Sequence, residues 1–202
     1  MYEEALRIHR ISHGDDSSKV AGSLNNLGNF LSDTGMLSEA RANYEEALGI
    51  LRRVHGERHP DVAGVFSNIA SVLRRQGHHD EALEMYKKAL KIKRRTLGKH
   101  HQDVAVNLHN IGFGLFSQGK YDEALEMYDK ALSIFTRALG IDNRQNARVH
   151  HNLALAKLQS GDRAGALASA REAVRIFNKH GVTDAASQAA VDLLRKLEGG
   201  AA

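Results

Sequence analysis

The chain has 202 residues, of which 42% are hydrophobic and 26% are charged, with a formal net charge of +4. This composition is that of an ordinary folded protein and argues against disorder. The chain has no cysteine, which excludes disulfides and thiolate metal sites and fits a reducing compartment. No apolar run approaches the length of about 18 residues that spans a membrane, and no signal peptide is recognisable. We therefore predict a cytoplasmic protein without a membrane partner.

A motif returns every 42 residues along the chain. Tyr2-Glu-Glu-Ala-Leu recurs from Tyr44, Tyr86 and Tyr128, and faintly from Ala170. A fixed period between about 20 and 50 residues is typical of stacked supersecondary units. Such a stack offers a long open surface and no deep pocket, so the period favours binding over catalysis.

Each repeat is predicted to contain two antiparallel helices. Apolar and small residues at helical spacing, such as Leu24, Leu27 and Gly28, mark the first helix. The small residue at the Gly28 position is expected where the two helices cross closely, and a glycine such as Gly35 is expected to end the first helix. The second helix opens on segments such as Ser38-Glu39-Ala40, whose side-chain oxygen is expected to cap it.

We therefore predict an all-α fold, a right-handed superhelical solenoid of antiparallel helix pairs. The drift of the fourth repeat is typical of a capping repeat, whereas the first helix is expected to be under-supported. The expected elements are an orphan second-type helix at 1–13, repeat 1 at 17–55, repeat 2 at 59–97, repeat 3 at 101–139, a degenerate repeat 4 at 143–180, and a C-terminal capping helix at 184–198.

Three segments resemble tetratricopeptide repeats of the kinesin light chain type. They are Leu24-Asn25-Asn26-Leu27-Gly28, the run from Gly119 to Ala124, and the run from Leu97 to Ala105. The resemblance covers nearly the whole chain. It implies an interaction module of the cargo-adaptor or scaffold kind, with no enzymatic activity of its own, and family asparagines that bind the backbone of an extended peptide.

The first helices are expected to line a concave groove. Asn26, Asn68, Asn110 and Asn152 recur at the repeat period, and an amide can both donate to and accept from a peptide backbone. The alternative is that each asparagine bonds its neighbouring helix and sets the curvature of the stack. The predicted peptide-binding residues are Asn25, Asn26, Asn29, Asn68, Ser71, Arg74, Arg75, His109, Asn110, Phe113, Phe116, Arg148 and Asn152.

Charged and aromatic residues beside this amide row predict the kind of ligand. Arg74, Arg75 and Arg148 suit carboxylates, which arginine binds bidentately. Phe113 and Phe116 would receive an apolar anchor, unless they belong to the core between repeats. The resemblance implies the same ligand, an acidic peptide with an aromatic residue.

Other partners and chemistries are less favoured. The basic stretch from Lys87 to Arg95 scatters over more than one helix face, so we interpret it as solvated surface, with a nucleic-acid or nuclear-import patch as the alternative. Adjacent histidine pairs such as His78-His79 point in different directions on a helix. We therefore predict no catalytic residue, no metal site and no cofactor.

Two other roles stay open. The first is an architectural or self-assembling segment of a larger protein, with a homo-oligomer formed through the N-terminal half-repeat. The second is a regulatory sensor beside a catalytic domain elsewhere in a parent protein.

Overall fold

The computed structural model describes residues 1–181 and 183–199 of the chain. The described residues form helices and contain no strand, which confirms the all-α prediction. The helices are, in chain order, α1 (Tyr2–His13), α2 (Ser18–Asp33), α3 (Leu37–His55), α4 (Pro60–Arg75), α5 (His79–Thr96), α6 (Gln102–Ser117), α7 (Tyr121–Leu139), α8 (Arg144–Gln159), α9 (Arg163–Lys179) and α10 (Ala185–Gly199).

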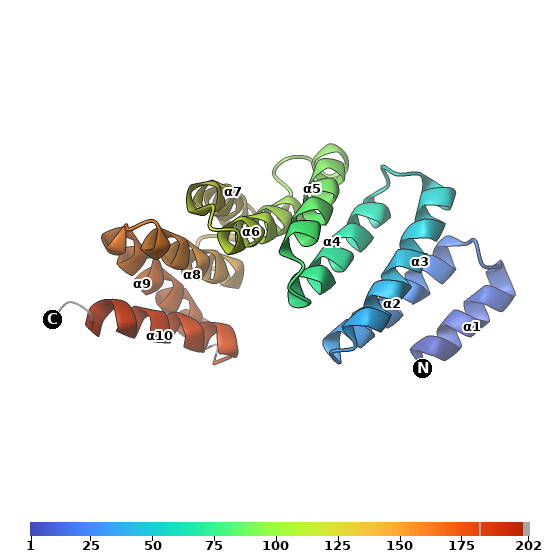
Figure 1. Ribbon diagram of the computed structural model, residues 1–202, viewed down its shortest axis with the longest axis horizontal. Coiled ribbons are helices and arrows are strands. Elements are labelled where there is room, and N and C mark those ends of the chain that lie inside the picture. Colours follow the sequence, from blue (N-terminus) through green and yellow to red (C-terminus); the bar gives the residue numbers. More distant parts are fainter. Residues whose placement is uncertain (182, 200–202) are drawn as a thin grey trace. The chain divides into compact units, whose positions relative to one another are not determined.

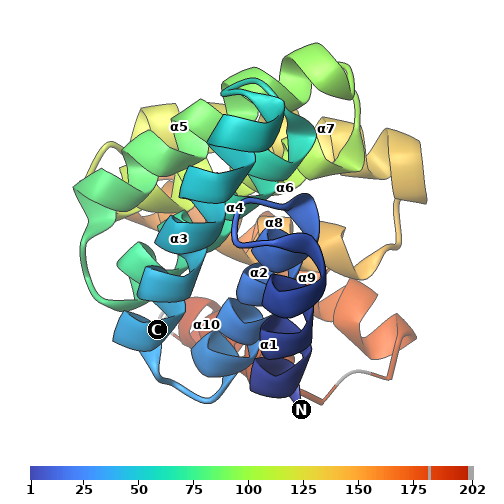
Figure 2. The same ribbon diagram turned by 90° about the vertical axis from the view of Figure 1, so that its right-hand side faces the viewer.

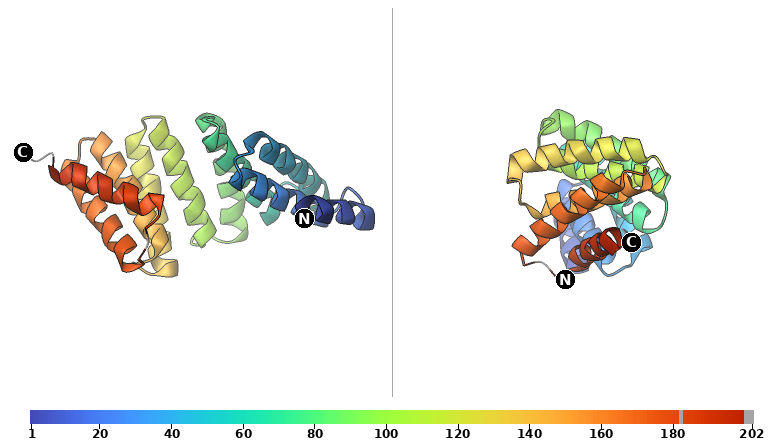
Figure 3. Two further views of the ribbon diagram at one scale, coloured as in Figure 1. Left: turned by 90° about the horizontal axis from the view of Figure 1, so that it is seen from below. Right: turned by 90° about the vertical axis from the view of Figure 1, so that its left-hand side faces the viewer.

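These helices belong to two compact units, the first from Met1 to Lys99 and the second from His100 onward. In the first unit, α2 packs on α3 and α4 packs on α5, while α1 lies against α2 (Figure 1 and Figure 2). In the second unit, α6 packs on α7 and α8 packs on α9, and α10 covers α9 (Figure 3). Each unit is therefore a stack of antiparallel helix pairs with one extra helix.

The first helix of each pair ends as expected, on a glycine with a left-handed backbone. Gly77 has φ of 85°, and the equivalent glycines in the other pairs share this conformation. The next residue, His78, donates its backbone N–H to the Leu73 carbonyl at 2.9 Å, which closes a Schellman motif. At the start of α4, Pro60 occupies the first turn and His59 caps the helix by accepting from the Asp61 N–H at 3.3 Å.

Side-chain caps were predicted for the second helices of the first three pairs, from Ser38, Asp80 and Asp122, and all three predictions were wrong. Each of these helices begins one or more residues earlier than expected, after Met36, His78 or Lys120, and none of these residues makes a side-chain cap. The acidic residues expected to cap lie inside the first turn, where they favour the positive end of the helix dipole. Only α9 keeps a cap of the expected kind, since Asp162 accepts from the Gly165 N–H at 2.8 Å.

The close crossing expected at the small residue of each first helix is confirmed. A Cβ added to Gly28 would lie 2.6 Å from the Tyr44 ring, and one added to Gly112 would lie 2.6 Å from the Tyr128 ring. Both tyrosines are almost fully buried. The repeated tyrosine motif is therefore a packing device, because its ring fills the space that the missing side chain leaves.

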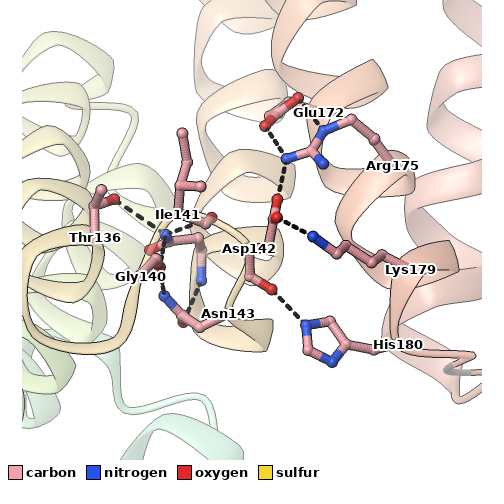
Figure 4. A network of polar contacts seen from close by, with 10 residues as sticks. Thr136, Gly140, Ile141, Asp142, Asn143, Glu172, Arg175, Lys179 and His180 are labelled. Carbon is pink, nitrogen blue, oxygen red and sulfur yellow. Dashed lines mark hydrogen bonds and ion pairs between the residues drawn. The ribbon is translucent and has the colours of Figure 1, made fainter.

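The connection between α7 and α8 is tied to the C-terminal half of α9 by charge (Figure 4). The Asp142 carboxylate accepts from Arg175 at 2.5 Å and from Lys179, and its carbonyl accepts from His180 Nε2. Arg175 also donates twice to Glu172, at 2.9 and 2.7 Å. These bonds from Lys179 and Arg175 lower the pKa of the Asp142 carboxyl below its usual value of 3.8.

Asp142→Asn is expected to lower the melting temperature at neutral pH, because Arg175 and Lys179 lose their shared carboxylate. A carboxyl whose pKa is depressed by folding stabilises the fold fully above its unfolded pKa, and this contribution is lost as pH falls through the folded value. Thermal unfolding of both proteins at about pH 7 and about pH 2.5 measures this. The two proteins should differ at the higher pH and converge at the lower one.

The control for this experiment is Asp129→Asn, which removes an exposed carboxylate from α7 in the same unit. It should change the melting temperature little at either pH. A difference between Asp142→Asn and the parent chain that is the same at both pH values would show that the network does not titrate.

Candidate functional site

The first helices of the first unit present a connected row of amides. Asn26 and Asn29 are exposed, whereas Asn25 and Asn68 are half-buried. Asn68 Nδ2 donates to Asn25 Oδ1 at 2.8 Å and lies 3.4 Å from Asn29 Oδ1, which also accepts from the Tyr44 hydroxyl at 2.7 Å. These bonds fix α2 relative to α4 and set the orientation of Asn25, Asn29 and Asn68.

The second unit carries the same kind of link between its first helices. Asn152 Nδ2 lies 2.7 Å from His109 Nε2, and the two residues are 43 positions apart, as Asn25 and Asn68 are. Because the amide nitrogen can only donate, His109 accepts through Nε2 and carries its proton on Nδ1. The alternative expected from the sequence, that asparagines tie neighbouring helices, thus describes Asn68 and Asn152.

Asn26 and Asn110 differ from these two. No side-chain hydrogen bond of either is recorded among the described residues, although both belong to the predicted row. Asn26 is exposed and Asn110 is half-buried. We name the surface formed by Asn110, Phe113, Arg148 and Asn152 in the second unit the first-helix surface, and Asn26, Asn29 and Asn68 form the corresponding amide row of the first unit.

Two of the three predicted arginines are used inside their own unit. Arg75 Nη1 donates to the Ser32 carbonyl at 2.6 Å and to the Ser32 hydroxyl at 2.9 Å, at the C-terminal end of α2. Arg74 hydrogen-bonds the Tyr86 hydroxyl, as Ser71 does. Arg148 is exposed, and no carboxylate of a described residue forms an ion pair with it. Arg148 is therefore the arginine best placed for a ligand.

The predicted phenylalanines lie at the surface of the second unit without being fully covered. Phe113 and Phe116 are both half-buried, and the Phe116 ring lies 5.5 Å from that of Tyr121. Sequence reasoning missed Val106, which is 37% exposed on the same helix. The sequence contains the pattern that predicts its position, because Val106, Asn110 and Phe113 follow helical spacing. Val106 is also the repeat equivalent of Arg148.

Burial controls the ionisation of the groups beside these asparagines in each unit. It raises the pKa of Tyr44 to about 12, with a smaller contribution from Asp33, and it also raises that of Tyr128. Burial lowers the pKa of His151, which lies on α8 beside Asn152. The tyrosines thus stay neutral hydrogen-bond partners, and the positive charge of this surface at neutral pH comes from Arg148 and not from His151.

The comparisons with known proteins agree with this architecture. The profile of the tetratricopeptide repeat matches residues 19–95, 61–118 and 103–179. The chain belongs to the tetratricopeptide repeat family. No curated protein sequence matches it.

Solved structures of other repeat proteins share this fold. BtubC (BKLC) from P. vanneervenii superposes with a TM-score of 0.77 at 24% identity, over 98% of this chain and 80% of that one. A Podosopora anserina protein, named for kinesin light chain and with nearly identical TPR-like repeats, gives 0.73 at 20% identity, over 89% of this chain and 86% of that one. A second structure with the same name gives 0.72 at 20% identity, over 89% of this chain and 87% of that one. At these identities the likeness concerns the fold.

Tetratricopeptide repeats generally mediate protein–protein interaction or scaffolding and are typically non-catalytic. None of the described helices is both long and apolar enough to cross a membrane. Protein partners are therefore the class of ligand that the family and the fold support.

One group of side chains among the described residues has the composition of a metal site. His55, His59 and Asp61 lie together in the connection between α3 and α4. The rings of His55 and His59 are stacked, with centroids 4.2 Å apart and planes 20° apart, so their in-plane lone pairs do not converge on one point. His101 caps α6 as His59 caps α4, with Leu97 in place of His55. Helix capping accounts for His59 without an ion.

Proposed function

We propose that this chain binds an extended acidic segment of a partner protein, with one aromatic anchor, on its first-helix surface. The observation that carries the proposal is in the second unit. Arg148 is exposed and unpaired among the described residues, and half-buried Phe113 lies with Val106 on the neighbouring first helix. A cation and an apolar surface there suit a carboxylate and an aromatic ring of one ligand.

The spacing of these groups limits the ligand. Arg148 lies one helical turn before Asn152, and Phe113 lies one turn after His109, to which Asn152 is bonded. Two turns amount to about 11 Å along a helix, which an extended chain covers in about three or four residues. We propose that the acidic residue and the aromatic anchor of the ligand are separated by this interval.

The amides supply contacts to the ligand backbone. Asn110 has no side-chain hydrogen bond to another described residue, while Asn152 is held in place by its bond to His109 of the preceding first helix. A side chain already fixed in one orientation loses little entropy on binding, so such amides cost less to use than mobile ones. An extended peptide held in this way is expected to bind with micromolar affinity.

Binding of paired peptides tests this proposal. Two labelled acidic peptides of equal charge are compared, one with a tryptophan and one with alanine in its place. The double variant Asn110→Ala and Arg148→Ala should weaken the tryptophan peptide by about ten-fold or more, through a lost hydrogen bond and a lost charge-assisted one. The matched control is Asn178→Ala with Arg137→Ala, on the second helices of the same unit. Equal binding of both peptides, or equal loss in both variants, would contradict the proposal.

A second candidate role, self-association, is favoured by the exposed apolar face of α1. Tyr2, Ile8 and Ile11 are 46%, 48% and 73% exposed, whereas the equivalent Tyr44 and Ile50 are at most 3% exposed. The first turn of α1 is acidic and its last turn is basic. An antiparallel pair of α1 helices from two copies would therefore join opposite charges and cover these side chains.

Sedimentation velocity over a range of protein concentrations tests self-association. We expect a concentration-dependent dimer that Ile8→Lys abolishes, because the substitution places a charge in the centre of the contact. Val54→Lys, which changes another exposed apolar residue of the first unit, is the matched control. A parent chain that stays monomeric at all concentrations would exclude this role.

A further inference from the structure

One side of α5 carries a cluster of positively charged side chains that is not part of the first-helix surface. Residues 85–102 contain seven lysines or arginines and no aspartate or glutamate. At about 100° per residue, Lys87, Lys88, Lys91, Arg94 and Arg95 fall within an arc of about 120°. All five are exposed. The sequence predicts that this stretch scatters over more than one face, but only Lys93 lies outside the shared arc.

Lys93 is the exception because it points away from the other five. It is half-buried, and its Nζ donates to the Ser67 hydroxyl at 3.2 Å. Lys87 is partly neutralised by Glu84 at 2.9 Å. The remaining cations of α5, which are Lys88, Lys91, Arg94 and Arg95, form no ion pair among the described residues.

The cations at the equivalent position in two other repeats are neutralised by carboxylates. Arg53 donates to Asp16 at 3.1 Å, and Lys179 donates to Asp142, in both cases across 37 residues of sequence. Arg95 occupies the same repeat position as these two cations, and the residue 37 positions before it is Arg58. Arg95 therefore has a cation, Arg58, at the repeat position where Arg53 and Lys179 have a carboxylate partner.

A second pair of repeat positions shows the same replacement of a carboxylate by a cation. Arg10 pairs with Glu46 at 2.6 Å, across 36 residues. The equivalent residues one repeat later are Arg52 and Lys88, both cationic, and both lie over the Phe66 ring, at 5.3 and 5.8 Å from its centroid. Glu57 offsets part of the charge of Arg52, at 2.9 Å. Cation–π contact with one ring makes this pair of like charges tolerable.

We propose that this surface, the α5 basic face, binds a run of carboxylates in an acidic segment of a partner protein. It consists of Arg52, Arg58, Lys88, Lys91, Arg94 and Arg95, all exposed residues of the first unit. The mutual repulsion of clustered positive charges lowers the stability of the unliganded fold, and a bound anion reduces this repulsion. Arginines supply forked donors that match carboxylates. The α5 basic face is a site additional to the first-helix surface and does not depend on it.

The surroundings favour a short acidic segment over a nucleic acid. Phe66 is only 3% exposed, so the face offers no ring on which a base could stack. From Lys88 to Arg95 the face is about 10 Å long. Residues 1–84 carry nine lysines or arginines against thirteen aspartates or glutamates. A long duplex would therefore meet acidic surface beyond the face, whereas a few consecutive carboxylates would not.

Binding of a labelled ten-residue oligoglutamate, measured by fluorescence anisotropy, tests the proposal. Affinity should fall by about ten-fold or more between about 50 and 200 mM salt, because exposed charges are screened. Lys91→Glu with Arg95→Glu should weaken binding at low salt by at least about ten-fold. The matched control is Ser133→Glu with Arg137→Glu, the equivalent positions of α7 in the second unit, and it should change binding less than about two-fold.

A second measurement separates loss of the site from loss of the fold. Arg95→Glu gives Arg58 a carboxylate in the register of Arg53 and Asp16, so the melting temperature of the double variant should be equal to or above that of the parent chain. The neutral variant Lys91→Gln with Arg95→Gln should show an intermediate loss of oligoglutamate binding.

Three outcomes would overturn the proposal. One is that oligoglutamate does not bind, and another is that the α7 control loses binding as much as the α5 variant does. The third is that a 20-base-pair DNA duplex competes with oligoglutamate at lower concentration and loses binding in the α5 variant, which would assign the face to nucleic acid. Oligoglutamate has no aromatic residue, so Asn110→Ala with Arg148→Ala should leave its binding unchanged. The experiment therefore distinguishes loss of peptide binding at the first-helix surface from loss of oligoglutamate binding at the α5 basic face.

Discussion

Gly112→Ala is expected to lower the free energy of unfolding by about 1–3 kcal/mol, as overpacking of a buried site does. The new Cβ would lie 2.6 Å from Tyr128 Cε1 and 3.2 Å from the Ala124 carbonyl oxygen. The ring is almost fully buried and the carbonyl belongs to a helix, so neither can move without shifting α6 against α7. Denaturant unfolding, followed by far-ultraviolet circular dichroism, measures the change.

Two other glycines provide matched controls for this experiment. Gly22 and Gly64 also lie inside first helices, and a Cβ on either would meet no atom within 4 Å. Alanine at these positions should stabilise the chain by about 0.5–1 kcal/mol, since glycine is a poor helix former. If Gly112→Ala behaved like these controls, Tyr128 would be able to move as freely as a surface side chain, and the account of the tyrosine motif would be wrong.

Asn146→Ala is expected to destabilise the second unit by about 1–3 kcal/mol, the cost of leaving buried polar groups unsatisfied. Asn146 is fully buried, and its Nδ2 donates to Thr136 Oγ1 at 3.0 Å and to the Gly140 and Ile141 carbonyls at 3.1 and 2.9 Å. The Gly140 carbonyl keeps a partner in the variant, because Asn143 Nδ2 also donates to it at 2.6 Å. The cost therefore arises at Ile141, at Thr136 and from the cavity.

The repeat supplies a second variant that checks this explanation. Val20, Val62 and Val104 occupy the position of Asn146 in the other repeats, and all three are fully buried. The Asn146 Oδ1 atom has no hydrogen-bond partner among the residues that the structure describes. Asn146→Val should therefore cost less than Asn146→Ala, because it fills the cavity and removes the unpartnered oxygen. A larger loss for valine than for alanine in thermal unfolding would contradict this.

Repetition made the helix pairs predictable from the sequence. The period aligned Gly28 with Gly112 and Tyr44 with Tyr128, so one interpretation of the pattern applied several times. The glycines that end the first helices were predictable for a related reason, since a left-handed residue is required there. The caps of the second helices were not predictable, because an aspartate in the first turn can stabilise the helix dipole without capping the helix.

The roles of the individual site residues depended on distances that the repeat does not reveal. Asn68 and Asn26 share a repeat position, yet only Asn68 has a preceding first helix with Asn25 within hydrogen-bond reach. Arg75 and Arg148 are both arginines on first helices, but Ser32 accepts from Arg75, while no described residue accepts a hydrogen bond from Arg148. The same residue type is thus structural in one pair and available to a ligand in another.

The most direct test of the first-helix surface is a titration followed by nuclear magnetic resonance. The tryptophan-containing acidic peptide is added to isotope-labelled protein that carries Lys91→Glu and Arg95→Glu, so that the α5 basic face does not bind it, and the side-chain amides of Asn110 and Asn152 are observed together with the backbone of α5. We expect the asparagine amide signals to shift in a saturable way, while the backbone signals of α5 change little. Shifts confined to α5, or none on the asparagines at saturation, would contradict the assignment of the first-helix surface as the peptide site.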